Sequence, residues 1–191
     1  MMLAVQVANS QAKGTNFSGT LQSLKEIRGQ NAVDAAVDNL RGPLREQVRL
    51  RQLVPVGWYS AADFGELLRA IDATTGGGVQ LIRDLARATT ERDFTGLHRM
   101  VVKLLSPSTV AQHTHRLLQL YFRGGTIDVE SKPHVVLIRF RGWHGFTPLV
   151  WEDLSASAEA VLHVVGAKNP RGKVASVSVT NADATLELRY D

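Results

Sequence analysis

The last third of the chain alternates polar and apolar residues in two neighbouring segments. Residues 126–130 follow this pattern, and after a short turn residues 134–141 place Val136, Ile138 and Phe140 on one face. A period of two residues is typical of a strand with one buried face. The two segments therefore predict a β-hairpin.

A helix and a second pair of strands are predicted to follow this hairpin. Apolar residues recur at helical spacing over residues 154–165, and Gly166 and Pro170 are typical of a helix end. Residues 175–179 and 185–190 then alternate again, on either side of a turn. The predicted order is β-β-α-β-β, an antiparallel sheet with one covered face and one face in water.

The first two thirds of the chain show helical spacing instead. We expect a short strand over residues 3–8 and a loop over residues 12–19 before the helical periodicity begins. Helices are then expected on either side of Gly29, after Pro43, after Ser60, and over residues 79–86, 94–105 and 108–123.

Together the two parts predict an α+β fold in a single domain spanning residues 1–191. Residues 1–124 supply a layer of about six helices, and residues 125–191 supply the antiparallel sheet on which this layer packs. One face of the sheet needs the helices to cover it, so one shared core is expected.

Composition narrows the protein class. The chain has 191 residues and no cysteine, which excludes disulfides, thiolate nucleophiles and cysteine-ligated zinc or iron-sulfur sites. No apolar run approaches the roughly 20 residues that span a bilayer, and the N-terminus lacks the basic leader of a secretory signal. We therefore expect a cytoplasmic protein with no membrane span.

The net charge of +4 belongs mainly to the N-terminal part, because acidic and basic residues nearly balance in residues 125–191. Arg41, Arg45 and Arg49 fall at successive i+4 positions of the helix expected after Pro43, which makes them a candidate basic patch for phosphates or an acidic partner. A solvated helix face is the simpler interpretation, so a nucleic-acid partner is not predicted.

One stretch has the glycine spacing of a phosphate-binding loop without its chemistry. Gly14 and Gly19 are correctly spaced, but Thr20 and Leu21 stand where the lysine and the metal-binding hydroxyl belong. A capped helix start is therefore favoured.

Catalytic and metal-binding patterns are equally weak. No serine lies in a nucleophile elbow, and the neighbouring acids Glu152 and Asp153 diverge by about 100° on a helix, as acids of a first turn do. Of the six histidines, His113 and His115 are two residues apart and point to different faces. We predict a protein that is not an enzyme and has no cofactor. A metal site would have to be formed by histidines that are distant in the sequence.

The segment between the predicted hairpin and the C-terminal helix concentrates aromatic residues. Trp143, His144, Phe146 and Trp151 lie in or just after a glycine-containing loop. Aromatic side chains with polar tips are typical of interfaces and small-ligand pockets. These residues are the candidate interface or ligand loop, and closure of the core by the two tryptophans is the alternative.

The order of short motifs along the chain resembles a known family. The motifs are Lys13-Gly14-Thr15, Trp58-Tyr59, Ala70-Ile71-Asp72, Gly76-Gly77-Gly78, Phe94-Thr95-Gly96, Ser106-Pro107, Tyr121 near Gly124, and Leu186-Glu187-Leu188-Arg189-Tyr190. They resemble the paralogous domain family of unknown function expanded in Myxococcus and related myxobacteria. That family is in turn distantly similar to haem-NO-binding, four-vinyl-reductase-like and TRAPP-subunit domains.

The resemblance implies a helical layer against a C-terminal antiparallel sheet and a ligand-sensing or scaffold role. Haem-binding relatives use a proximal histidine and a Tyr-x-Ser-x-Arg motif, and this chain lacks that motif. The sequence therefore favours a non-enzymatic signalling or scaffold domain that binds a protein partner or itself, for example as a homodimer. The alternative is a sensor that binds a small apolar ligand between the helices and the sheet.

Overall fold

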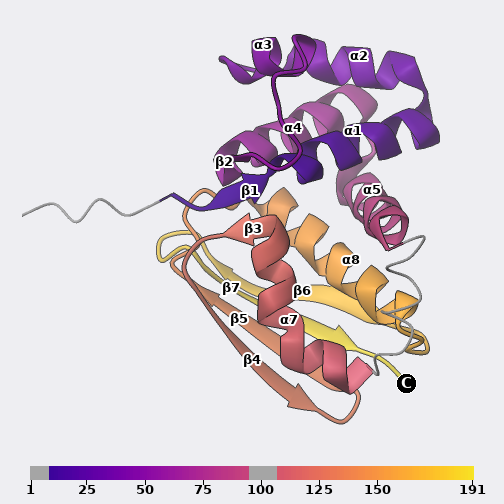
Figure 1. The fold of residues 1–191 in the computed structure, drawn as a ribbon, viewed down its shortest axis with the longest axis vertical. Helices are drawn as coiled ribbons and strands as arrows, with labels where there is room; N and C mark the ends of the chain where they lie inside the picture. Colours follow the sequence, from indigo (N-terminus) through magenta and orange to yellow (C-terminus); the bar gives the residue numbers. More distant parts are fainter. Residues whose placement is uncertain (1–8, 95–106) are drawn as a thin grey trace, which may run out of the picture.

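The computed structural model describes residues 9–94 and 107–191, which fold into helical layers stacked on a sheet (Figure 1). Helices α1 to α4 lie at one end, α7 and α8 lie over one face of the large sheet, and α5 lies between α8 and the first helices. None of the helices in these two ranges combines the length and the apolar composition needed to cross a membrane.

The N-terminal helices begin and end largely where the sequence predicts. Helix α1 spans Gly14–Arg28 and α2 spans Gln30–Asn39, and Gly29 separates them with a φ of +84° that favours glycine. Helix α3 spans Leu44–Arg49, and α4 spans Ala61–Thr75. The predicted helix starts after Gly29 and Ser60 are therefore confirmed.

Three more helices lie in the described ranges. Helix α5 spans Gly78–Asp93, α7 spans Pro107–Tyr121, and α8 spans Pro148–Val164. The threonine before α8, Thr147, accepts a hydrogen bond from the backbone N–H of Val150 through its side chain. The strand expected over residues 3–8 and most of the helix expected over 94–105 lie outside the described residues.

The predicted β-β-α-β-β order is confirmed. Strands β4 (Thr126–Lys132), β5 (Val135–Arg141), β6 (Arg171–Ser178) and β7 (Asp183–Arg189) form an antiparallel sheet in the order β4-β5-β7-β6. The inner face carries Val136, Ile138 and Phe140 of β5, each at most 1% exposed. On the outer face, Arg139 donates a hydrogen bond of 2.6 Å to Glu130.

A second, smaller sheet was not predicted. Its strands are β1 (Gln11–Lys13), β2 (Trp58–Ser60) and β3 (Phe122–Arg123), in the order β2-β1-β3. The loop expected over residues 12–19 is therefore wrong, because this stretch contains the end of β1 and the start of α1. Strands of two or three residues carry no measurable period, and here their partners are distant in sequence.

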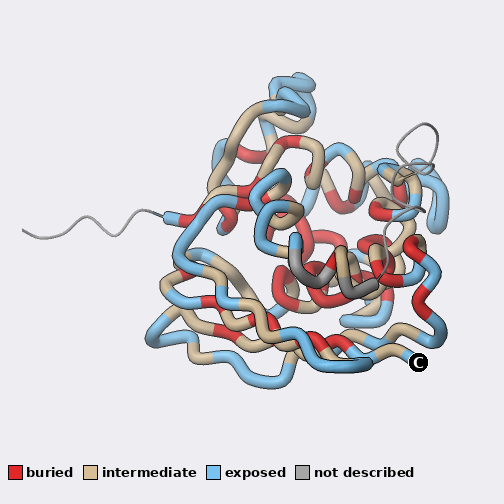
Figure 2. The backbone as a smooth tube through the Cα atoms, turned by 60° about the horizontal axis from the view of Figure 1, so that its bottom comes forward, coloured by how far each residue is buried: buried red, intermediate tan, exposed pale blue. Residues whose placement is uncertain are grey.

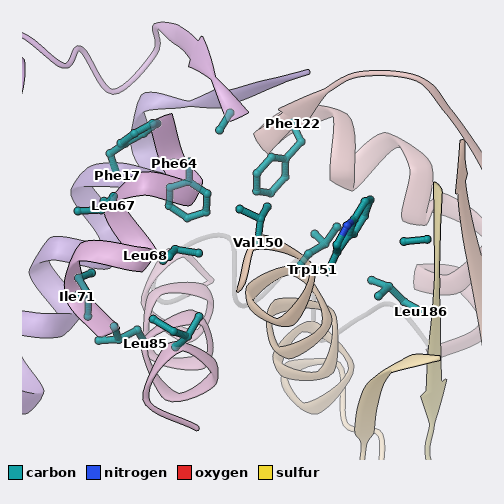
Figure 3. Close-up of a cluster of buried hydrophobic side chains, with 14 of the residues drawn as sticks. Phe17, Phe64, Leu67, Leu68, Ile71, Leu85, Phe122, Val150, Trp151 and Leu186 are labelled. Atoms are coloured by element: carbon teal, nitrogen blue, oxygen red, sulfur yellow. The ribbon is translucent and has the colours of Figure 1, made fainter. Parts of the chain in front are cut away.

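Buried residues run from the first helices through α8 to the inner face of the sheet (Figure 2). The ring of Phe17 packs edge to face on that of Phe64, with centroids 5.3 Å apart, and the ring of Phe122 is tilted against Phe64 at 6.1 Å. Val150 and Trp151 continue the core toward Leu186 of β7 (Figure 3). Helix α8 is therefore packed on both sides, between the first helices and the large sheet.

Candidate functional site

The core contains a partly open cavity between the helices and the large sheet. Helices α5, α7 and α8 each turn one face toward it, and Val136 of β5 and Leu188 of β7 close the side of the sheet. Phe64 and Phe122, which stack on each other, border it toward the first helices. The cavity lies between the helical layer and the sheet, which is where the alternative prediction from the sequence, a small-ligand sensor, places its ligand.

The faces of α7 and α8 that line the cavity follow helical periodicity. Helix α8 contributes the successive pairs Asp153 and Leu154, Ser157 and Ala158, Val161 and Leu162. Pairs four residues apart lie one above another on a helix. Helix α7 contributes Val110, Thr114, Leu117, Leu118 and Tyr121, which are also spaced as one face.

The walls of the cavity are mainly apolar. The cavity has a volume of about 90 Å³. A single water molecule needs roughly 10–15 Å³ by this measure. The cavity therefore has room for one small organic molecule in an apolar environment.

Asp153 is the charged residue in the cavity-facing stripe of α8, where Ser157 is the other polar residue. It is 6% exposed, and within the two described ranges no hydrogen bond or ion pair reaches its carboxyl group. Burial raises the pKa of Asp153 to about 7. A carboxyl group without a partner in an apolar site is energetically unfavourable, and its protonation near neutral pH relieves that cost.

A second carboxyl group in the cavity already has a partner. Asp93, at the end of α5, accepts a hydrogen bond from the hydroxyl of Tyr121 on α7. Burial and the neighbouring carboxyl raise the pKa of Tyr121 to about 12, and burial also raises the pKa of Asp93. Asn16 of α1 donates a hydrogen bond of 3.0 Å to the backbone oxygen of Tyr121, which ties this pair to the first helix.

An ion-pair network fixes α8 against α5 outside the cavity. Arg83 donates to Glu152 at 2.8 Å and to Glu159 at 2.9 Å, and Arg87 donates to Glu159 at 2.8 Å. Glu159 also accepts the backbone N–H of Gly172 on β6 at 2.8 Å. Glu152 therefore faces a guanidinium group while its neighbour Asp153 faces the cavity. The expectation that both are first-turn acids is wrong, since α8 begins at Pro148 and has no acid in its first turn.

The predicted aromatic loop is placed mainly in the core. Trp143 and Trp151 are 2% and 1% exposed, and Nε1 of Trp143 donates to the backbone oxygen of Thr126 at 3.1 Å. Phe146 packs between them, with ring centroids 5.1 and 4.5 Å away, and His144 is half-buried. None of these four residues lines the cavity. Binding of a partner by this segment stays a prediction.

The three arginines of the predicted basic patch do not share one helical stripe. Arg41 precedes α3, which begins at Leu44 and has only six residues. Arg45 donates a hydrogen bond of 3.0 Å to the backbone oxygen of Leu40, and Arg49 forms an ion pair with Asp38. The stripe fails because Gly42 and Pro43 interrupt the helix that the i+4 spacing assumes. Its proposed binding role stays a prediction.

The described histidines are dispersed. His113, His115 and His163 are exposed on α7 and α8, and His134 lies in the turn after β4. His98 lies outside the described residues. Across 9–94 and 107–191, no three side chains among His, Asp and Glu are arranged to hold a metal ion.

The sequence patterns therefore assigned no binding role to Asp153 or to the pair Asp93 and Tyr121. For Asp153 a signal was present, since it stands four residues before Ser157 and eight before Val161 on the face that carries the apolar periodicity. An acid on such a face conflicts with burial, and conflicts of this kind occur at functional sites. The contact between Asp93 and Tyr121 depends on the tertiary fold.

Comparisons with known proteins define the fold. No family model matches the chain, and no curated protein matches it. Solved structures do match, among them the Fe(II) unliganded H-NOX protein from K. algicida, with a TM-score of 0.69, 12% identity, and coverage of 94% of this chain and 96% of that one. An oxygen-binding H-NOX domain related to soluble guanylate cyclases matches with a TM-score of 0.64 and 9% identity, covering 94% and 95%.

A third structure, from work on haem redox potential and porphyrin distortion, has a TM-score of 0.64 at 10% identity and covers 94% of this chain and 99% of that one. At these identities the likeness establishes the fold alone. It confirms the expected α+β fold, with helices N-terminal and the antiparallel sheet C-terminal, and the long-range similarity to haem-NO-binding domains.

Proposed function

We propose that this chain is a sensor domain that binds a small, mainly apolar molecule in the cavity between α5, α7, α8 and the large sheet. The observation that carries the proposal is the cavity itself, which three helical faces and two sheet residues line with mostly apolar side chains. Pockets of this kind, apolar with a few polar groups, are the usual form of small-molecule sites.

The shared fold supports a sensor, because the matched structures include an oxygen-binding H-NOX domain. The scaffold prediction depended on the aromatic loop, and both of its tryptophans are core side chains. We propose binding without a chemical reaction, and the cytoplasmic location and the likeness to the myxobacterial paralogous family stay predictions.

Haem, the cofactor named for one of the matched structures, does not fit the described residues of this cavity. Haem iron needs an axial His, Cys, Met or Tyr. Tyr121 alone of the described lining residues is of these types, and with a pKa of about 12 and a hydrogen bond to Asp93 it remains a phenol. The charged groups of the described lining are the acids Asp93 and Asp153, which repel propionates.

The test uses toluene as a neutral apolar probe. Isothermal titration should show saturable binding at one site, and amide chemical-shift changes should cluster on α5, α7 and α8. Ala158→Leu fills the cavity from α8 and should abolish binding, because Ala158 lines it. Ala175→Leu adds the same atoms on the exposed side of β6 and should leave binding unchanged.

Native mass spectrometry of the purified protein provides an independent measurement. A retained small molecule that the Ala158→Leu variant loses would support the proposal. Toluene binding that is absent, or that Ala158→Leu does not affect, would overturn it.

A further inference from the structure

We infer that the ligand of this cavity is a small apolar amine whose ammonium group binds the carboxyl group of Asp153. The inference rests on the proposed function and adds the chemical class of the ligand. It depends on the position of Asp153, the sign of the charges around the cavity, and the direction of the apolar stripe.

Without a ligand, the buried carboxyl group of Asp153 destabilises the folded protein. Aspartate has a low helix propensity, and this one lies inside α8, nearly fully buried and without a hydrogen bond or ion pair from the described residues. A buried polar group that lacks a partner destabilises the fold by about 1–3 kcal/mol, and more if it is charged. A ligand that supplies the missing donor accounts for a carboxyl group at this point of a mainly apolar stripe.

The charges around the cavity favour a cation. Lys, Arg and His are not among the described residues that line it, whereas Asp93 of α5 and Asp153 of α8 are. Asp93 already accepts the hydroxyl of Tyr121 from α7, and β5 and β7 contribute only Val136 and Leu188. Of the two acids in the described lining, Asp153 is therefore the one without a partner and the one left to bind an ammonium group.

The apolar stripe sets the orientation of the bound molecule. From Asp153 the lining continues along α8 to Ala158, Val161 and Leu162. Eight residues of helix rise roughly 12 Å. An amine bound at Asp153 places its apolar body along these two turns, against Val136 and Leu188 of the sheet.

Protonation of Asp153 supplies an additional signature. The pKa of its carboxyl group is raised to about 7 by burial, so a bound cation has to hold it ionised. Amine binding should therefore weaken about tenfold from pH 8 to pH 6, while binding of a neutral molecule should hardly change.

The experiment compares toluene with benzylamine, which adds one ammonium group to the same ring. For the wild-type protein at pH 8, benzylamine should bind roughly 10- to 100-fold more tightly than toluene, as expected for a hydrogen bond to a charged group. Asp153→Asn should remove this preference and retain toluene binding. Asp128→Asn removes an exposed carboxylate on β4 and should retain the preference. This variant is the control for a non-specific attraction of cations to the acidic groups of the protein.

The outcomes separate the two proposals. Absence of toluene binding overturns the proposed function, whereas toluene binding without a preference for benzylamine overturns only the amine. A preference that persists in Asp153→Asn also overturns it. If Asp153→Asn does not fold, the wild-type pH dependence decides, since equal pH dependence for the two probes contradicts an ion pair at Asp153.

Discussion

The Nη2 atom of Arg83 on α5 lies 2.9 Å from Oε2 of Glu159 on α8, and the same nitrogen donates to the backbone oxygen of Gly172 on β6 at 2.8 Å. One guanidinium group thus joins α5 of the N-terminal part to α8 and to β6. The cavity lies on the other side of α8, so this contact sets the position of its wall.

Arg83→Met should destabilise the protein by about 3 kcal/mol. The side chains of Arg83 and Glu159 are only 12% and 15% exposed, so removing the guanidinium leaves a carboxylate largely buried with one cation fewer. Urea unfolding followed by circular dichroism measures the difference. Arg49→Met removes an ion pair whose side chains are 51% and 65% exposed and should cost at most about 0.5 kcal/mol. Equal losses in the two variants would contradict the structural role of Arg83.

Asp153 should make the stability of the wild-type protein fall as pH rises. The pKa of Asp153 in the folded protein is about 7, above the ordinary value of 3.8. As pH rises, the unfolded chain therefore loses this proton before the folded protein does, and the ionisation lowers the free energy of the unfolded state. Stability contributed by the protonated carboxyl is complete below about pH 4 and is lost by pH 7, for a total of about 4 kcal/mol.

Asp153→Asn cannot titrate, so it should equal the wild type near pH 4 and exceed it in stability at pH 8. Urea titrations at pH 4, 6 and 8 measure the difference between the two proteins. A difference that does not change with pH would show that the carboxyl is not buried as described.

Tryptophan fluorescence should report the burial of the aromatic loop. Trp143 and Trp151 are in the core, whereas Trp58 is half-buried in the small sheet beneath the guanidinium of Arg123, at 3.9 Å. Acrylamide should therefore quench mainly Trp58. Trp58→Phe should leave emission that acrylamide hardly quenches, and strong residual quenching would place an indole of the loop at the surface.

Gly172→Ala should cost about 2 kcal/mol. A Cβ atom at this position would lie 2.6 Å from the backbone oxygen of Ser155 on α8, and backbone cannot move aside as a side-chain tip does. Ala175→Ser, on the exposed part of the same strand, should change the free energy of unfolding by less than about 0.5 kcal/mol. Thermal unfolding of the two variants gives the comparison.

The sequence predicted those parts of the fold that repeat a pattern over many residues. Alternation gave β4, β5 and β7, and Gly29 and Gly166 marked helix ends because few other residues adopt their positive φ. The order of the strands in each sheet and the small sheet depend on pairing between distant residues, which no local pattern encodes.

The candidate site was predicted only as a location. A space between helices and sheet followed from the layer order, but its polar groups did not. Asp153 was set aside as one of two adjacent acids, and only the packing of α5 on α8 separates Glu152, which meets Arg83, from Asp153, which meets the cavity. The aromatic composition of the loop predicted an interface or a ligand site, but both of its tryptophans are buried in the core.

The small sheet has a consequence for synthesis of the chain on the ribosome. Its central strand, β1, pairs on one side with β2 and on the other with Phe122 and Arg123 of β3, and Asn16 reaches the backbone of Tyr121 across a separation of 105 residues. The first helices therefore emerge long before the strand that completes their sheet, and one edge of β1 stays open until then. A nascent chain that ends before Phe122 should hold its N-terminal helices without a closed core, which makes them a substrate for chaperones until the second half follows.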